Sequence, residues 1–173
     1  MKTYTNKFVA VAMIAATLTG LIASPEVASA RTAQEFCPSA QKAVRSFSKR
    51  LGISAPSVEL SDTGSTYYLR TKWMIKLAAD DCGKKSVVAH EYGHYVVDVA
   101  ANGELDEFLR LSALFTSGSN WLRTSKDEGG WERAAHCVGH ALAGYGAYTK
   151  CPHRSLRTAA VGILDLASNA VRP

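Results

Sequence analysis

The segment His90–His94, with the sequence H-E-Y-G-H, constrains the fold more than any other part of the chain. Two histidines four residues apart share one face of a helix, with a rise of about 6 Å between them. From that face both imidazoles can bind one metal ion at about 2.0–2.1 Å. Glu91 lies beside the first histidine, where its carboxylate can reach a metal-bound water without binding the metal. The pattern is therefore typical of a helix that carries a hydrolytic zinc site.

The first thirty residues have the pattern of a secretory signal peptide, and we exclude them from the fold. Lys2 and Lys7 give a positive start before the apolar run Phe8–Ala23. Ala28–Ala30 has the A-x-A form of a cleavage site. A membrane anchor is the alternative interpretation, but the run is short for a spanning helix of about 20 apolar residues. We expect residues 1–30 to be cleaved and the protein to be secreted, either extracellular or associated with the cell envelope. No second membrane segment is expected.

Residues 31–173 have the length of one domain, and we expect a single domain that acts as a monomer. The chain carries a formal net charge of +5. The signal segment contributes +1 through Lys2, Lys7 and Glu26, so the remainder carries +4. This charge is spread along the sequence, and no basic run has interleaved aromatic residues. The composition therefore gives no reason to expect nucleic acid as a partner.

Four cysteines remain after export, at Cys37, Cys82, Cys137 and Cys151. In an oxidising compartment an even number of cysteines predicts two disulfides, for which three pairings are possible. A cysteine metal site is the alternative, but the chain has no C-x-x-C pair. We favour a Cys137–Cys151 disulfide, which would tie a helix end to the following loop, and therefore a Cys37–Cys82 disulfide.

The hydrophobic periodicity predicts several helices and a small sheet. The predicted helices are Pro38 to Gly52, Ser86 to Asn102-Gly103, Leu105–Phe115, Trp131 to about Tyr145, and a last helix with Ser155 as its N-cap. The predicted strands are Ser57–Leu60, Thr66–Arg70 and Trp73–Leu77. Loops are predicted at Thr116–Asn120 and Ser125–Gly130. This order indicates an α+β fold, with a small antiparallel sheet packed against a mainly helical part that contains an active-site helix pair.

A catalytic zinc site needs a third protein ligand and one open position for water. A histidine six residues after His94 would complete one known arrangement, but that position is Ala100. Glu132, at the start of a later predicted helix, is the best candidate, because its carboxylate can face His90 and His94 if the two helices pack side by side. His136, one turn after Glu132, is the alternative third ligand, in which case Glu132 lies outside the site.

Two segments together resemble gluzincin-type zinc metallopeptidases, in which a helix with H-E-x-x-H is followed by a helix with E-x-x-A-D. These are His90–His94 and Glu132–Cys137, the latter reading E-R-A-A-H-C. More narrowly, they resemble secreted bacterial neutral zinc metallopeptidases with H-E-x-G-H and a later E-x-x-A-D-C. The resemblance covers Val87–Val97 and Trp131 to about Gly139, a minority of the chain.

This resemblance implies a zincin-like domain in which His90, His94 and Glu132 bind zinc and Glu91 is the general base. The chain departs from the family at His136, which replaces an aspartate that orients a ligand histidine. A neutral imidazole can accept the same hydrogen bond, but without the charge of a carboxylate.

A secreted zinc metalloendopeptidase is the function that these residues indicate. Glu91 would take a proton from the attacking water and pass it to the leaving amine. Tyr145, Tyr148 and His140 are unranked candidates for a donor to the oxyanion. The predicted strand Trp73–Leu77 is a candidate edge for pairing with an extended peptide substrate.

Two other functions remain open. The first is a secreted, disulfide-stabilised binding module of the cell envelope, whose inactive or structural zinc site would be closed by His136 as a fourth ligand. The second is a metal-free helical domain, in which H-E-Y-G-H occurs by chance. The apolar residues on both sides of the motif favour a buried helix, where polar groups need partners such as a metal. Asp98, one turn after His94, could support that histidine, but we interpret it as a solvated or capping carboxylate.

Overall fold

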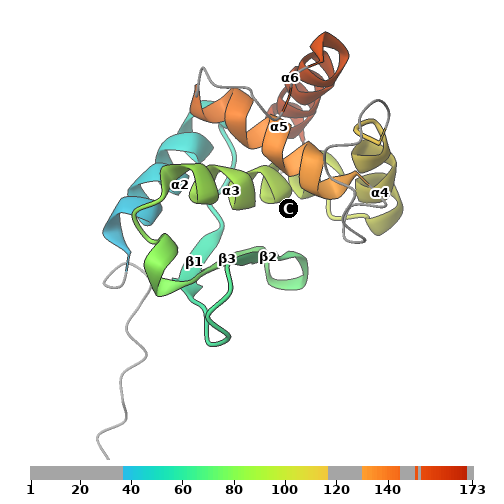
Figure 1. The fold of residues 1–173 in the computed structure, drawn as a ribbon. Coiled ribbons are helices and arrows are strands. Elements are labelled where there is room, and N and C mark those ends of the chain that lie inside the picture. The colour runs from blue at the N-terminus through green and yellow to red at the C-terminus, as the bar shows by residue number, and fades with distance from the viewer. Residues whose placement is uncertain (1–36, 117–129, 145–150, 152, 171–173) are drawn as a thin grey trace, which may run out of the picture. The chain divides into compact units, whose positions relative to one another are not determined.

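The structure is a computed structural model that describes residues 37–116, 130–144, 151 and 153–170, all within the unit Arg31–Pro173. These residues form five α-helices and a three-stranded sheet (Figure 1), which confirms the α+β class. The helices are α2 (Pro38–Leu51), α3 (Lys85–Ala100), α4 (Leu105–Ala113), α5 (Trp131–Ala143) and α6 (Arg154–Asn169). The strands are β1 (Ser57–Leu60), β2 (Tyr67–Leu69) and β3 (Met74–Leu77). The predicted signal segment, residues 117–129 of the predicted loops, Tyr145 and Tyr148 lie outside the described residues.

The sheet is mixed, and the prediction of an antiparallel sheet was wrong. Its strand order is β1-β3-β2, with β1 parallel and β2 antiparallel to β3. A turn-forming stretch that includes Ser61-Asp62-Thr63-Gly64 joins β1 to β2, but the two strands are not neighbours in the sheet. Instead β3 lies between them, because Ile75 and Leu77 are completely buried and the central position covers both of its edges.

The central position of β3 also corrects a functional prediction. Both edges of β3 are paired inside the sheet, so this strand is not available to an added peptide. A short 3₁₀ turn, Arg70–Lys72, and a left-handed Trp73 (φ 50°) connect β2 to β3. Among the described strands, β2 is the outer antiparallel one, and it lies against α3.

Most helix ends follow from local sequence. Gly52 ends α2 in the left-handed conformation, with φ 69°. After α3 the chain turns through Asn102 and Gly103, both with positive φ, as predicted for a helix stop. The N-cap prediction for α6 was wrong: α6 begins at Arg154, with His153 at the N-cap and no side-chain cap hydrogen bond.

Helix α3 is the centre of the fold and contacts α2, α4, α5, α6 and two strands. Ten of its sixteen residues are buried, so it is apolar on most sides rather than on one face. The hydroxyl of Tyr92 is hydrogen-bonded to Ser48 (2.7 Å), and that of Tyr95 donates to the carbonyl of Ser54 (2.7 Å). None of the helices among the described residues has the length and apolar character needed to span a membrane.

Two glycines let α3 and α5 cross at very short range. A Cβ atom on Gly93 of α3 would lie 2.0 Å from the carbonyl oxygen of Ala135 on α5. Reciprocally, a Cβ atom on Gly139 of α5 would lie 2.0 Å from the carbonyl oxygen of Ala89 on α3. Real Cβ atoms do not approach a backbone oxygen so closely, so each crossing point requires glycine. Figure 1 shows α5 lying beside α3.

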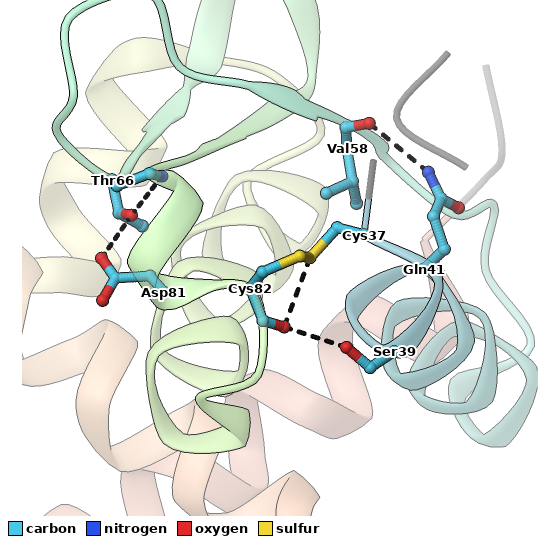
Figure 2. The surroundings of a disulfide bond; sticks show 8 residues. Cys37, Ser39, Gln41, Val58, Thr66, Asp81 and Cys82 are labelled. Carbon is cyan, nitrogen blue, oxygen red and sulfur yellow. Dashed lines mark hydrogen bonds between the residues drawn. A yellow bond between two sulfur atoms is a disulfide. The ribbon is translucent and has the colours of Figure 1, made fainter. Parts of the chain in front are cut away.

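Both predicted disulfides are present. Cys37 and Cys82, with Cα atoms 5.5 Å apart, tie the start of α2 to the segment that precedes α3. Figure 2 shows this bond, and the hydroxyl of Ser39 beside it donates to the carbonyl of Cys82 at 3.0 Å. Cys137 of α5 is bonded to Cys151, with Cα atoms 5.3 Å apart, just before α6. Because they restrict the unfolded chain, disulfides of this kind stabilise the fold.

We expect Gly93→Ala and Gly139→Ala each to lower the free energy of unfolding by about 1–3 kcal/mol or more, because the added methyl group overlaps the backbone of the facing helix. Gly162→Ala in α6 is the matched control, since nothing lies within 4 Å of its added Cβ. That control should raise stability by about 0.5–1 kcal/mol through helix propensity. Urea unfolding of the three variants checks this, and equal effects of all three would contradict the close crossing.

Candidate metal centre

Helix α3 presents His90 and His94 on one face, as their spacing predicted. Their ring centroids are 5.0 Å apart, and the rings are nearly perpendicular. Their side chains are 22% and 12% exposed. The two imidazoles therefore lie at the border between the core and a surface that solvent can reach.

Helix α5 brings Glu132 to the same place. Its carboxylate oxygens lie 3.0 Å from Nε2 of His90 and 3.7 Å from Nε2 of His94. Glu132 is in the first turn of α5, so the crossing of the two helices places the start of α5 over the histidines. The structure thus brings together the three residues that we predicted as metal ligands.

The start of α5 is held by two features beside Glu132. Gly130, the N-cap residue, has φ 73°, and a Cβ atom there would lie 2.5 Å from the carbonyl oxygen of Ser112. The buried guanidinium of Arg133 donates to the carbonyl of Phe115 (2.7 Å). The close packing at Gly130 and the hydrogen bond of Arg133 both join the start of α5 to the end of α4. Backbone packing therefore sets the position of Glu132 relative to the two histidines.

The three donors have a spacing that fits a metal ion. One donor atom from each of His90, His94 and Glu132 can be chosen so that all lie within 4.8 Å of one another. Tetrahedral zinc at about 2.0–2.1 Å from its ligands separates them by about 3.3 Å, a value between the two nitrogen–oxygen distances found here. Two imidazoles and one carboxylate are also a ligand set that zinc accepts in sites with an open fourth position. The group could therefore hold a metal ion with modest side-chain movement.

Two glutamates at this site have opposite electrostatic environments. Hydrogen bonds to His90 and then to His94 hold the pKa of Glu132 far below its ordinary value. Burial raises the pKa of Glu91, which is only 7% exposed, although the nearby histidines and the backbone N–H of Tyr68 partly oppose that rise. Glu132 therefore favours its anionic form, as a carboxylate ligand must, and Glu91 takes up a proton more readily than a solvated glutamate.

His136 lies beside the three donors but outside their group. Its ring centroid is 5.8 Å from that of His90 and 4.1 Å from that of His140. Among the described residues, the group of possible metal donors contains Glu132 and not His136. His136 is therefore a neighbour of His90 and not a member of the donor group.

The interpretation of Asp98 as a solvated or capping residue was wrong. Asp98 is completely buried and accepts a hydrogen bond from the hydroxyl of Tyr68 (2.9 Å) and one from Nε of Arg70 (2.8 Å). Arg70 also donates to the carbonyl of Gly103. The ring of Tyr68 is stacked parallel to that of His94, with centroids 6.5 Å apart. Asp98 therefore ties the outer strand β2 to the helix that carries the histidines.

Two of the three donors, His94 and Glu132, line a cleft of about 370 Å³ between β2 and the helices. Its lining residues from β2 and its flanks are Thr66, Tyr67, Tyr68 and Arg70. The helices contribute Glu91, His94, Leu105, Phe108, Trp131 and Glu132. The sequence analysis missed the β2 residues and those of α4, since only the fold brings them next to the motif.

Three residues were predicted as candidates for a donor to the oxyanion: His140, Tyr145 and Tyr148. His140 is buried on α5 beside His136 and does not line the cleft, so it does not reach a substrate there. Tyr145 and Tyr148 lie outside the described residues.

Comparison with known proteins adds no relative to this picture. Searches of protein-family models, curated proteins and solved structures find no match to the chain. The function of the site is therefore inferred from its residues and motifs.

Replacing Glu132 by alanine should weaken zinc binding more than replacing His136. We expect Glu132→Ala to raise the dissociation constant by more than about 100-fold, because a ligand is lost. His136→Ala should raise the dissociation constant by only about 10- to 100-fold, the effect of losing a residue that supports a ligand. Competition with a chromophoric chelator measures both, with circular dichroism to confirm folding. The reverse order would assign the third ligand to His136.

Proposed function

We propose that the protein is a secreted zinc metalloendopeptidase. One observation carries the proposal: His90, His94 and Glu132 form a possible metal-binding group, and two of them, His94 and Glu132, line a cleft together with the buried Glu91 and the outer strand β2. Three protein donors leave a zinc position for water, which is what hydrolysis requires and a structural site lacks. The resemblance of the two motifs to gluzincin-type peptidases points to the same chemistry.

Each residue of the group has a separate task in peptide hydrolysis. His90, His94 and Glu132 would hold zinc, which supplies a Lewis acid that acidifies water and polarises a carbonyl group. Glu91 takes a proton from the attacking water and delivers it to the leaving nitrogen. The raised pKa of Glu91 suits the first step, because a more basic carboxylate accepts a proton from water more readily.

In this proposal an extended substrate pairs with β2 and not with β3. Tyr67 and Tyr68 of β2 line the cleft, and the backbone N–H of Tyr68 interacts with the carboxylate of Glu91. An extended peptide that adds to the edge of β2 that no described strand covers would run past Glu91 and His94. The anchoring of β2 to α3 through Asp98 keeps that edge at a constant distance from the general base.

The two disulfides support an oxidising compartment, in agreement with the predicted signal segment. The alternative function, a binding module with a closed metal site, would need His136 as a fourth ligand. The donor group of His90, His94 and Glu132 favours the enzyme over that alternative.

Purified protein without the signal segment should contain one zinc ion and cleave casein, and a chelator should abolish cleavage. Glu91→Gln should keep the zinc and lower kcat by at least about 100-fold, because the proton acceptor is lost. His94→Ala should lose both metal and activity.

Metal analysis and peptide release measured on the same samples check these outcomes. Zinc bound stoichiometrically with no hydrolysis of casein or of a peptide library would contradict the enzyme and favour the binding module.

A further inference from the structure

The exposed face of α2 carries only positive charge. The helix contains four cationic residues and no acidic residue. All four cations are exposed: Lys42, Arg45, Lys49 and Arg50. At 3.6 residues per turn, Lys42, Arg45 and Lys49 lie within about 60° of one another around the helix axis, and they span about 10 Å along it. They therefore form a narrow row of positive charge on the side of α2 that faces solvent.

Ion pairs within the protein do not account for this row. Several other cations are matched with acids in the described part of the chain: Arg70, Lys76, Lys84 and Arg110. Lys42, Lys49 and Arg50, in contrast, form no ion pair with any described residue. The helix dipole favours cations in the last turn, at Lys49 and Arg50, but it does not explain Lys42 in the first half of the helix. Like charges three or four residues apart also destabilise a helix, so an anion that covers the row would relieve this repulsion.

The basic row lies away from the metal-binding group. Helix α2 packs on α3 through Tyr92, whose ring centroid lies 5.3 Å from that of Phe47 and whose hydroxyl is hydrogen-bonded to Ser48. Tyr92 is two residues from both His90 and His94, which is about 200° around the axis of α3. Helix α2 therefore covers the side of α3 opposite the two histidines, and none of its residues lines the cleft.

The shape and chemistry of this face favour a linear polymer of phosphate groups. The apolar side of α2 is buried in the core, so the helix cannot enter a lipid surface as a membrane-bound amphipathic helix does. Phe47, the one aromatic residue of α2, is also buried, so the exposed face offers no ring on which a nucleic-acid base could stack. Ammonium and guanidinium groups both bind phosphate oxygens through charge-assisted hydrogen bonds. A narrow row of such groups matches an extended chain of phosphates.

We propose that the exposed face of α2, with Lys42, Arg45, Lys49 and Arg50, is a docking surface for a linear phosphate polymer that carries no bases. The polymer would run along the helix axis, with its phosphates against the cations of the row. This inference does not depend on the proposed function, because it uses neither the donor group nor the cleft.

The test uses protein without the signal segment and fluorescently labelled long-chain inorganic polyphosphate, with binding measured by anisotropy. For three or four cations on a single phosphate chain, affinity should fall roughly 20- to 50-fold between about 50 and 200 mM salt, because each neutralised phosphate releases counterions. Affinity should be the same with and without a chelator. Loss of binding on chelation would overturn the proposal, because the polyphosphate would then be held through a metal ion.

Lys42→Glu combined with Lys49→Glu should weaken polyphosphate binding by at least about 10-fold and reduce its salt dependence by about half. The new acids lie three and four residues from Arg45, a spacing that favours the helix, so we expect this variant to fold. Circular dichroism checks its folding.

Lys72→Glu combined with Arg157→Glu is the matched control, because it changes the net charge by the same amount and both residues are exposed and outside α2. This control should bind polyphosphate within about threefold of wild type, since salt screens charges that do not contact the polymer. Equal weakening by the two double variants would overturn the assignment to α2.

Two further ligands distinguish other partners. Vesicles that contain phosphatidylglycerol present anionic charge on a flat surface, and oligothymidylate presents phosphates together with bases. Both should bind the protein less tightly than polyphosphate. Tighter binding of the vesicles would assign the face to a membrane surface, and tighter binding of oligothymidylate would assign it to nucleic acid. Either result would overturn the proposal.

Discussion

The close crossing of α3 and α5 is the constraint on which the candidate site depends. Gly93 and Gly139 each meet a backbone carbonyl of the facing helix, so the helix axes approach nearer than side chains would allow. This approach brings the first turn of α5, and with it Glu132, within hydrogen-bond distance of His90. A methyl group at either crossing point would push the helices apart and separate the donors of the site. The geometry of the possible metal-binding group therefore depends on the packing of the core.

Sequence patterns predicted the parts of the site that depend on one helix at a time. The i, i+4 spacing of His90 and His94 and the position of Glu132 at a helix start are local features, and the structure shows both. The pairing of the two helices was expected, but their close crossing at the glycines was not predicted, although small residues four apart occur on both helices, Ala89 with Gly93 and Ala135 with Gly139. Which of several small residues faces a partner is decided by tertiary packing, and no local pattern contains it.

The sheet and Asp98 show the same limit from another side. The predicted bounds of β1 and β3 were correct within one residue. The order of the strands in the sheet depends on tertiary packing, which buries Ile75 and Leu77 of the central strand completely. Asp98 looked like a surface carboxylate because its partners Tyr68 and Arg70 lie 28 or more residues away. Its burial is acceptable because both oxygens accept hydrogen bonds, one of them from a cation. Long-range partners of this kind become visible only in the folded chain.

A zinc-loaded crystal structure with anomalous diffraction recorded at the zinc absorption edge tests the central claim most directly. It should show one ion within about 2.0–2.2 Å of a nitrogen of His90, a nitrogen of His94 and a carboxylate oxygen of Glu132, with a fourth position facing Glu91. An ion bound by His136 in place of Glu132, or one fully enclosed by four protein ligands, would contradict the account.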